Sequence, residues 1–313
     1  MKKSLIAVAM LAVCATSAFA QSSVNLSGTI DAGIEAPGGN NRVAVKSGGN
    51  AQNQVTLSGA EDIGGGLKAT FKVSTQFNIN DNKVSTGFGN NDTYVGLEGS
   101  AGTIRLGRSF DPAYTHALTA NDRFGVTGYQ TIGTALSDNG LRVSNQLLYI
   151  SPTYFGFTGT FSYGSADGQK GTGANREQGF GVRYLNGPIE LTAASARPAG
   201  FNTKYLNQIG GAYDFQVARV LLTVQRNNNP SFNGNTAKNA YALGVTAPVG
   251  PGQLWASYDI KNFSNSGNGR VAQLGYKYNL SKRTVVYGQV ATKNSAFDGV
   301  SSNGAGVGLT HSF

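Results

Sequence analysis

The chain closes on Val307-Gly308-Leu309-Thr310-His311-Ser312-Phe313, and this stretch decides the fold. Bulky side chains alternate in it with small or polar ones, which is the two-residue period of a β-strand with one bulky face. A strand that ends on an aromatic residue needs a partner to hold it, because free chain ends fray. A closed membrane barrel supplies that partner, since lipid offers none to an open sheet edge and the last strand must pair with the first. The stretch therefore predicts an all-β transmembrane barrel.

The first twenty residues predict a secretory signal peptide. A basic start at 1–3 precedes an apolar stretch at 4–13 that is too short to span a bilayer, and Ala18-Phe19-Ala20 offers a cleavage site. A lipoprotein signal at Cys14 is the weaker alternative, because Val13 stands where that motif needs a small residue. Cleavage after Ala20 leaves one barrel domain, 21–313, without cysteine, which excludes disulfides and thiolate metal sites.

Composition agrees with an exported barrel. The chain has 44 glycines, 14 tyrosines and 16 phenylalanines, and its charged residues make up only 13%, against about 25% in soluble domains. Mean hydropathy is −0.20, and no apolar run approaches the ~18–20 residues of a membrane helix. Composition alone leaves a soluble secreted β-protein open as an alternative.

Alternating polar and apolar residues continue along the whole chain after the signal. The pattern favours an antiparallel barrel with about 18 residues for each strand and its connection. We count 16 alternating segments, at 24–35, 53–60, 67–77, 92–99, 102–108, 143–151, 156–164, 178–186, 188–197, 206–215, 217–226, 239–247, 253–262, 271–280, 283–292 and 303–313. No helical periodicity is evident after residue 20.

The connections between these segments are alternately short and long, as expected for the periplasmic turns and outer loops of a bacterial barrel. The connection at 108–142 is too long for a simple loop and too rich in apolar residues for disorder. We therefore expect this third long loop to fold into the lumen and pack against the inner wall.

The ordered motifs resemble a known family. Tyr276-Lys277-Tyr278-Asn279-Leu280-Ser281-Lys282-Arg283-Thr284-Val285-Val286-Tyr287 looks like the Y-x-Y-x-L-S-K-R-T-x-x-Y signature of the Gram-negative general porins of neisserial and burkholderial bacteria, and 307–313 is similar to their V-G-L-x-H-x-F ending. Further matches extend over the mature chain, at 22–28, 59–69, 95–99, 106–108 and 149–152.

The resemblance implies a sixteen-stranded outer-membrane barrel that assembles as a homotrimer and whose 108–142 loop narrows the lumen. It also implies that Phe313 is part of the signal read by the barrel-insertion machinery. Three charged positions of the family depart here: Gln54 and Asn91 or Asp92 replace arginines, and Ser74 replaces a glutamate. The family's pore lining therefore cannot be carried over whole.

A barrel of this size encloses a water-filled channel, so the predicted function is passive diffusion of ions and small hydrophilic solutes among the outer-membrane lipids. The chain carries 25 Lys and Arg against 16 Asp and Glu, a formal net charge of +9, which favours anions in the lumen. The expected basic wall at the constriction consists of Lys68, Lys72, Arg105, Arg108 and Arg142. The loop residues expected to face it are Asp111, Asp122, Arg123 and Asp138.

Two other classes of function stay open at this stage. A plugged barrel that serves as an adhesin or structural anchor would have the same strand pattern. An outer-membrane hydrolase needs a nucleophile, base and carboxylate cluster, for which His116 is the one internal histidine. We find no motif for a catalytic site, cofactor or metal, and the dispersed basic residues argue against nucleic-acid binding.

Overall fold

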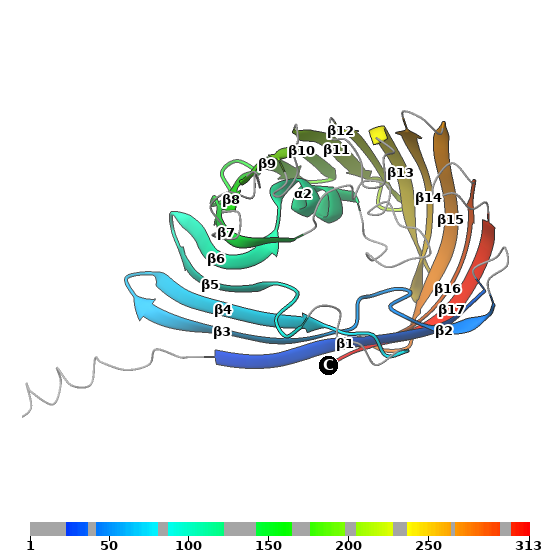
Figure 1. Cartoon of the computed structure of the whole chain (residues 1–313), viewed down its shortest axis with the longest axis horizontal. Coiled ribbons are helices and arrows are strands. Elements are labelled where there is room, and N and C mark those ends of the chain that lie inside the picture. The colour runs from blue at the N-terminus through cyan, green and yellow to red at the C-terminus, as the bar shows by residue number, and fades with distance from the viewer. Residues whose placement is uncertain are drawn as a thin grey trace, which may run out of the picture.

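Figure 1 shows the computed structural model as a ring of strands with one helix, α2, lying inside the ring. The structure describes residues 23–36, 42–80, 87–121, 142–164, 176–197, 205–227, 237–263, 267–294 and 302–313. Helix α2 spans Pro112–Asn121. The strands are β1 (Ser23–Ala36), β2 (Ala44–Ser47), β3 (Gln54–Gly64), β4 (Leu67–Gln76), β5 (Thr93–Gly99), β6 (Gly102–Phe110), β7 (Arg142–Ile150), β8 (Phe157–Gly164), β9 (Glu177–Asn186), β10 (Ile189–Arg197), β11 (Leu206–Asp214), β12 (Arg219–Asn227), β13 (Ala237–Val249), β14 (Gly252–Phe263), β15 (Asn268–Asn279), β16 (Thr284–Lys293) and β17 (Ser302–Ser312).

Strands β2 and β3 share one position beside β1. β2 pairs with one end of β1, from Ala32 to Glu35, and β3 pairs with the other end, from Ser23 to Thr29. The seventeen strands among the described residues therefore fill sixteen positions of one antiparallel barrel, which confirms the predicted strand number. β2 lies within the connection 36–52, where the sequence pattern predicts only a loop.

The barrel closes between its first and last strands. β1 and β17 run antiparallel in register from the pair Thr29 and Ser312 to the pair Ala36 and Ala305. The two backbone hydrogen bonds between Gly28 and Phe313, each 3.0 Å long, continue this seam to the last residue. A methyl group on Gly28 would overlap the Phe313 ring, so glycine at this position lets the terminal aromatic side chain lie flat across β1.

Short and long connections separate the two ends of the barrel. Short turns join β3 to β4, β5 to β6, β7 to β8, β9 to β10, β11 to β12, β13 to β14 and β15 to β16. The other connections lie at the opposite end and are longer, except for 264–267 between β14 and β15. In bacterial outer-membrane barrels the short turns are periplasmic and the long loops extracellular. We call these the turn end and the loop end. Among the described residues, no helix is both long and apolar enough to cross a membrane.

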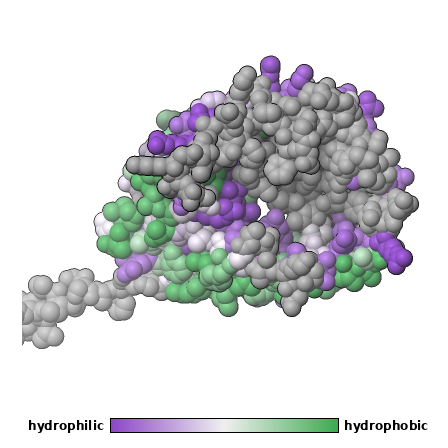
Figure 2. Space-filling model, in the orientation of Figure 1, coloured by the Kyte–Doolittle hydropathy of each residue, from purple (hydrophilic) through white to green (hydrophobic). Residues whose placement is uncertain are grey.

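Each strand presents an apolar face outward and a mostly polar face inward, as the two-residue period predicts. On β12, Leu222 and Val224 are exposed on the outer wall, whereas Arg219 and Thr223 are buried on the inner one. Figure 2 shows hydrophobic residues along the lower outer face, where Figure 1 places β1 to β4, and hydrophilic residues toward the opening. Trp255 lies on the inner face, only 4% exposed, and covers Gly275 of the neighbouring strand.

The described start of the long connection after β6, residues 111–121, lies in the lumen, as predicted, but it forms a helix. Helix α2 packs against the inner wall formed by β8 to β12. Its Ala113 is buried in an apolar cluster with Ala194, Ala196 and Leu206 of β10 and β11. The expectation that no helix follows residue 20 is thus wrong. The reason is that α2 is short and enclosed, so it lacks the polar face that makes a helix visible in a sequence.

The seam between β1, β16 and β17 is held from inside by Asp31. Its side chain, fully buried, accepts hydrogen bonds from the Gly49 N–H at 2.7 Å, the Tyr287 hydroxyl at 2.9 Å and the Thr310 hydroxyl at 2.5 Å. One carboxylate therefore binds the segment between β2 and β3 to both sides of the closure.

We predict that Asp31→Ala lowers the free energy of unfolding by about 2–5 kcal/mol, because it leaves several buried donors without an acceptor. Asp31→Asn should cost less, since it keeps one acceptor oxygen. Denaturant unfolding of the refolded barrel measures both values. Ser195→Ala is the matched control, because its hydroxyl bonds only the exposed Asn207. Equal stability of Asp31→Ala and the control would contradict this role of Asp31.

Candidate functional site: the inner wall of the barrel

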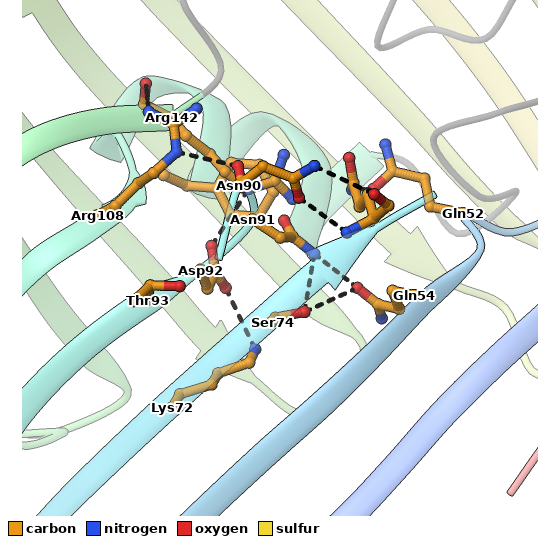
Figure 3. Close-up of polar contacts among 12 residues, drawn as sticks. Gln52, Gln54, Lys72, Ser74, Asn90, Asn91, Asp92, Thr93, Arg108 and Arg142 are labelled. Atoms are coloured by element: carbon orange, nitrogen blue, oxygen red, sulfur yellow. Dashed lines mark hydrogen bonds and ion pairs between the residues drawn. The ribbon is translucent and has the colours of Figure 1, made fainter. Parts of the chain in front are cut away.

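A cluster of charged and amide side chains lines the inner wall at the loop end of β3 to β7 (Figure 3). Asp92, immediately before β5, lies 3.2 Å from the Lys72 ammonium and 3.3 Å from the Arg142 guanidinium. Lys72 keeps 31% of its side chain exposed, whereas Arg142 keeps only 9%. Of the two cations paired with Asp92, Lys72 is therefore the one that the lumen reaches more readily. We name Lys72, Asp92, Arg105, Arg108 and Arg142 the basic wall.

Backbone hydrogen bonds fix the position of Asp92. The segment before β5 continues its pairing with β4, since Ser74 N–H donates to Asp92 O at 3.0 Å and Asn91 N–H donates to Ser74 O at 3.1 Å. The Asn90 side chain adds a third link, because its Oδ1 accepts the Gln76 N–H at 2.8 Å. The carboxylate is thus held against the wall by the sheet itself.

The two remaining arginines of the basic wall are braced differently. Arg108 lies at a register shift in β6, and its guanidinium donates to Asn90 O at 3.0 Å and to the Ser144 hydroxyl at 2.7 Å. The Arg105 guanidinium lies 4.5 Å from the centre of the Tyr94 ring on the neighbouring strand. A cation over a ring face is held without losing its charge. Four cations and one carboxylate give the basic wall a net charge of +3.

The positions that depart from the family pattern lie together beside the basic wall. The Asn91 amide donates to Gln54 Oε1 at 2.6 Å and to Ser74 Oγ at 3.1 Å. Ser74 Oγ also lies 2.8 Å from the Thr56 hydroxyl. Neutral side chains thus satisfy one another at positions where the resemblance implies charges. Among the described residues, Asp92 is the one carboxylate that forms ion pairs with the basic wall.

A second ion cluster lies on the wall that carries α2. Glu190 of β10, fully buried, accepts from Arg183 Nε at 2.6 Å and from Arg219 Nη2 at 2.5 Å. Two cations share one carboxylate, so the cluster keeps a net charge of +1. Arg183 retains 31% of its side chain exposed and is the member that solutes can meet. Both arginines lie on the inner face, as the alternation in their strands predicts.

His116 of α2 lies against this second wall. It is 3% exposed, and a methyl group on Gly181 of β9 would overlap its ring. Burial, together with the nearby Arg183 charge, lowers the pKa of His116 to about 4. The imidazole is therefore neutral at pH 7 and fills the notch left by glycine as a packing group.

The structure separates several of the predicted site residues. Lys68 lies beside Asp62 and Glu98 in the strand register, next to the turn end, and does not join the basic wall. Asp111 does not face the basic wall either, because it is buried and its Oδ1 accepts the Tyr114 N–H at 2.7 Å, which caps α2. Asp122, Arg123 and Asp138 lie outside the described residues.

The two carboxylates that accept ion pairs on the inner wall, Asp92 and Glu190, were not among the predicted site residues. Glu190 could have been found, because it alternates with the outward Ile189 and Leu191 and therefore faces the inner arginines of the adjacent strands. Asp92 begins the alternating segment 92–99 and shares the inward phase of Tyr94, but the sequence did not show that Lys72 and Arg142 would be its partners.

Comparison with known proteins agrees with this architecture. The sequence profile of the Gram-negative porin family matches residues 7–297. The chain belongs to the Gram-negative porin family. It is 33% identical to outer membrane porin protein 32 of Delftia acidovorans, over 98% of this chain and 95% of that protein. It is 28% identical to the major outer membrane protein P.IB of Neisseria meningitidis serogroup B, over the full length of both.

Solved structures give the same result. The anion-selective porin from Comamonas acidovorans superposes with a TM-score of 0.80 at 29% identity, over 94% of this chain and all of that chain. OmpT of Vibrio cholerae, at 17% identity and a TM-score of 0.69, shares the fold. This porin is accordingly a protein of the cell outer membrane.

We predict that Gly181→Ala displaces α2, because the new methyl group would overlap the His116 ring. Strand β9 is hydrogen-bonded on both sides, so α2 has to move instead of the strand. Overpacking of this kind costs about 1–3 kcal/mol. Single-channel recording should show a lower and noisier conductance than in the native porin. Gly159→Ala on β8 is the control, since its added methyl group meets only Ser151 at ordinary contact distance. A native conductance trace for Gly181→Ala would contradict the packing described for α2.

The N-cap of α2 should make its docking depend on pH. Burial, together with the nearby Glu177 charge, raises the pKa of Asp111 to about 7. The folded loop therefore favours protonated Asp111, and the associated stability is complete below about pH 4 and is lost as pH rises through about 7. Hydrogen exchange of 112–121 should be slower at pH 5 than at pH 8, after correction for the intrinsic rate. Asp111→Asn, which can still cap the helix, should abolish the difference; a difference that persists in this variant would exclude Asp111 as its source.

Proposed function

We propose that this porin is a general diffusion channel that prefers anions. The observation that carries the proposal is the basic wall, where Asp92 balances only one of four cations. Arg183 adds positive charge on the inner face of β9, two strands beyond β7. Fixed positive charge along a narrow aqueous path raises the local concentration of anions and lowers that of cations. The similar solved structure from Comamonas acidovorans is that of an anion-selective porin, which supports the same preference.

Transport of this kind needs no chemical step. Solutes cross by diffusion, and the wall residues select by charge and size alone. We propose that the protein has no enzymatic activity, which the enclosed position and lowered pKa of His116 support, because a general base must be reachable by a substrate.

We also propose that the porin works as a homotrimer. The support is the membership of the family, and an outer wall whose neighbouring strands β1, β3, β4 and β5 all carry exposed apolar residues, including Leu26, Leu57, Phe71 and Val95. Crosslinking followed by gel electrophoresis without heating should give a species of three chains.

The selectivity proposal is tested by single charge changes at the basic wall. Asp92→Asn removes the one carboxylate, so it should increase the permeability ratio of chloride to potassium in a planar bilayer. Lys72→Gln removes the more exposed of the two cations paired with Asp92, so it should lower that ratio. Lys282→Gln, which removes an equal charge from the exposed turn between β15 and β16, is the control. Ratios that stay unchanged in both wall variants would contradict the assignment.

A further inference from the structure

A second basic surface lies outside the barrel. Arg176, Arg197 and Arg226 belong to the loop ends of β9, β10 and β12, and each follows the phase of its strand's outward residues. Arg197 lies opposite Gln178 in the strand register, and Gln178 lies opposite Tyr163. Arg226 lies opposite Asn207, whose Oδ1 accepts the Ser195 hydroxyl at 2.9 Å. We name Arg176, Arg197 and Arg226 the outer arginine patch.

Tyrosines accompany the outer arginine patch. The Arg176 guanidinium lies 6.0 Å from the centre of the Tyr163 ring. The Tyr205 hydroxyl, at the start of β11, donates to Gln178 Oε1 at 3.2 Å. Tyrosine collects where one end of the ring meets hydrocarbon and the other meets polar headgroups. The patch thus has the composition of a membrane interface.

The position along the strands agrees with this composition. Arg197 is eight residues beyond Ile189, the first residue of β10 at the turn end, which is about 26 Å along a strand. With the tilt of barrel strands, this corresponds to about 20 Å along the membrane normal, close to the ~25 Å height of an outer-membrane apolar band. An arginine on the lipid face is costly at the midplane of the membrane and much less so at this level.

Among the residues that the structure describes, the patch has no acidic counterpart nearby. Within the described part of the chain, none of the ion pairs involves these three arginines, and the Arg197 Nε has no hydrogen-bond partner. The exposed carboxylates of the described residues, Glu61, Asp62, Glu98 and Asp214, all lie at the turn end. A second copy of the chain, oriented the same way in the membrane, would therefore bring none of these carboxylates to the patch.

We propose that the outer arginine patch binds the phosphate of an anionic lipid in the outer leaflet. Arginine forms paired, charge-assisted hydrogen bonds with phosphate oxygens, and Gln178, Ser195 and Asn207 offer further polar groups beside them. The acyl chains of such a lipid would lie on the exposed apolar residues directly below, including Phe180 and Leu191. The site lies on the outer wall, so it does not depend on the ion selectivity of the lumen.

The test is native mass spectrometry of the refolded porin in neutral detergent, with phosphatidic acid or phosphatidylcholine added at equal concentration. The native porin should retain phosphatidic acid in preference to phosphatidylcholine. The double variant Arg197→Gln with Arg226→Gln should lose that preference several-fold, and the corresponding double lysine variant should keep most of it. Removal of two charges at the turn end, by Lys282→Gln with Arg283→Gln, is the matched control and should change nothing.

Three results would overturn the proposal. The native porin could bind both lipids equally, the arginine and turn-end variants could lose phosphatidic acid to the same extent, or the arginine variant could lose its oligomeric state while lipid binding stays unchanged. Salt provides an independent measurement on the native protein, because the preference should weaken as ionic strength rises. Native single-channel conductance in the arginine variant confirms that the barrel is intact.

Discussion

Closure of the sheet is the constraint on which the rest of this structure depends. A strand edge facing lipid would leave backbone N–H and C=O groups without partners, at several kcal/mol each. The pairing of β1 with β17, from Thr29 to Ala36, removes that edge. The seam is made by small residues that let the strands approach and by Asp31, which binds three separate segments from inside. Once the barrel is closed, successive side chains of each strand alternate between two environments, with one set in contact with lipid and the other facing the lumen.

The charge clusters of the inner face therefore form without a sequence motif. Its chemistry arises from cross-strand neighbours, such as Lys72 and Asp92 or Arg183 and Glu190, that form no local signature in the sequence. The helix α2 completes the site by occupying the wall of β8 to β12, which leaves the basic wall facing the remaining lumen. Loop and wall are thus complementary: the glycines of β9 receive α2, and the cations of β4 to β7 stay accessible to solutes.

Much of this architecture is predictable from the sequence, because the alternation of apolar and polar side chains along a strand can be read directly from the order of residues. Strand number, the outward and inward faces and the inward fold of the third loop all follow from it or from the family's motifs. The cluster at Asp92 was not predictable, since it depends on which residues before β5 continue the ladder of β4. The prediction that Asp111 faces the basic wall was wrong for a similar reason. Its position in the sequence, close to Arg108, did not show that its side chain caps α2. Trp255 could be placed only once its register with Gly275 was known.

The most direct test of this account is the zero-current potential of the native porin in a planar bilayer that separates two KCl concentrations. The basic wall and the cluster at Glu190 together predict a potential whose sign shows chloride to be more permeant than potassium. A potential of the opposite sign would mean that carboxylates dominate the lumen. The absence of any conductance would mean that α2 and its loop close the barrel, and would contradict the channel function itself.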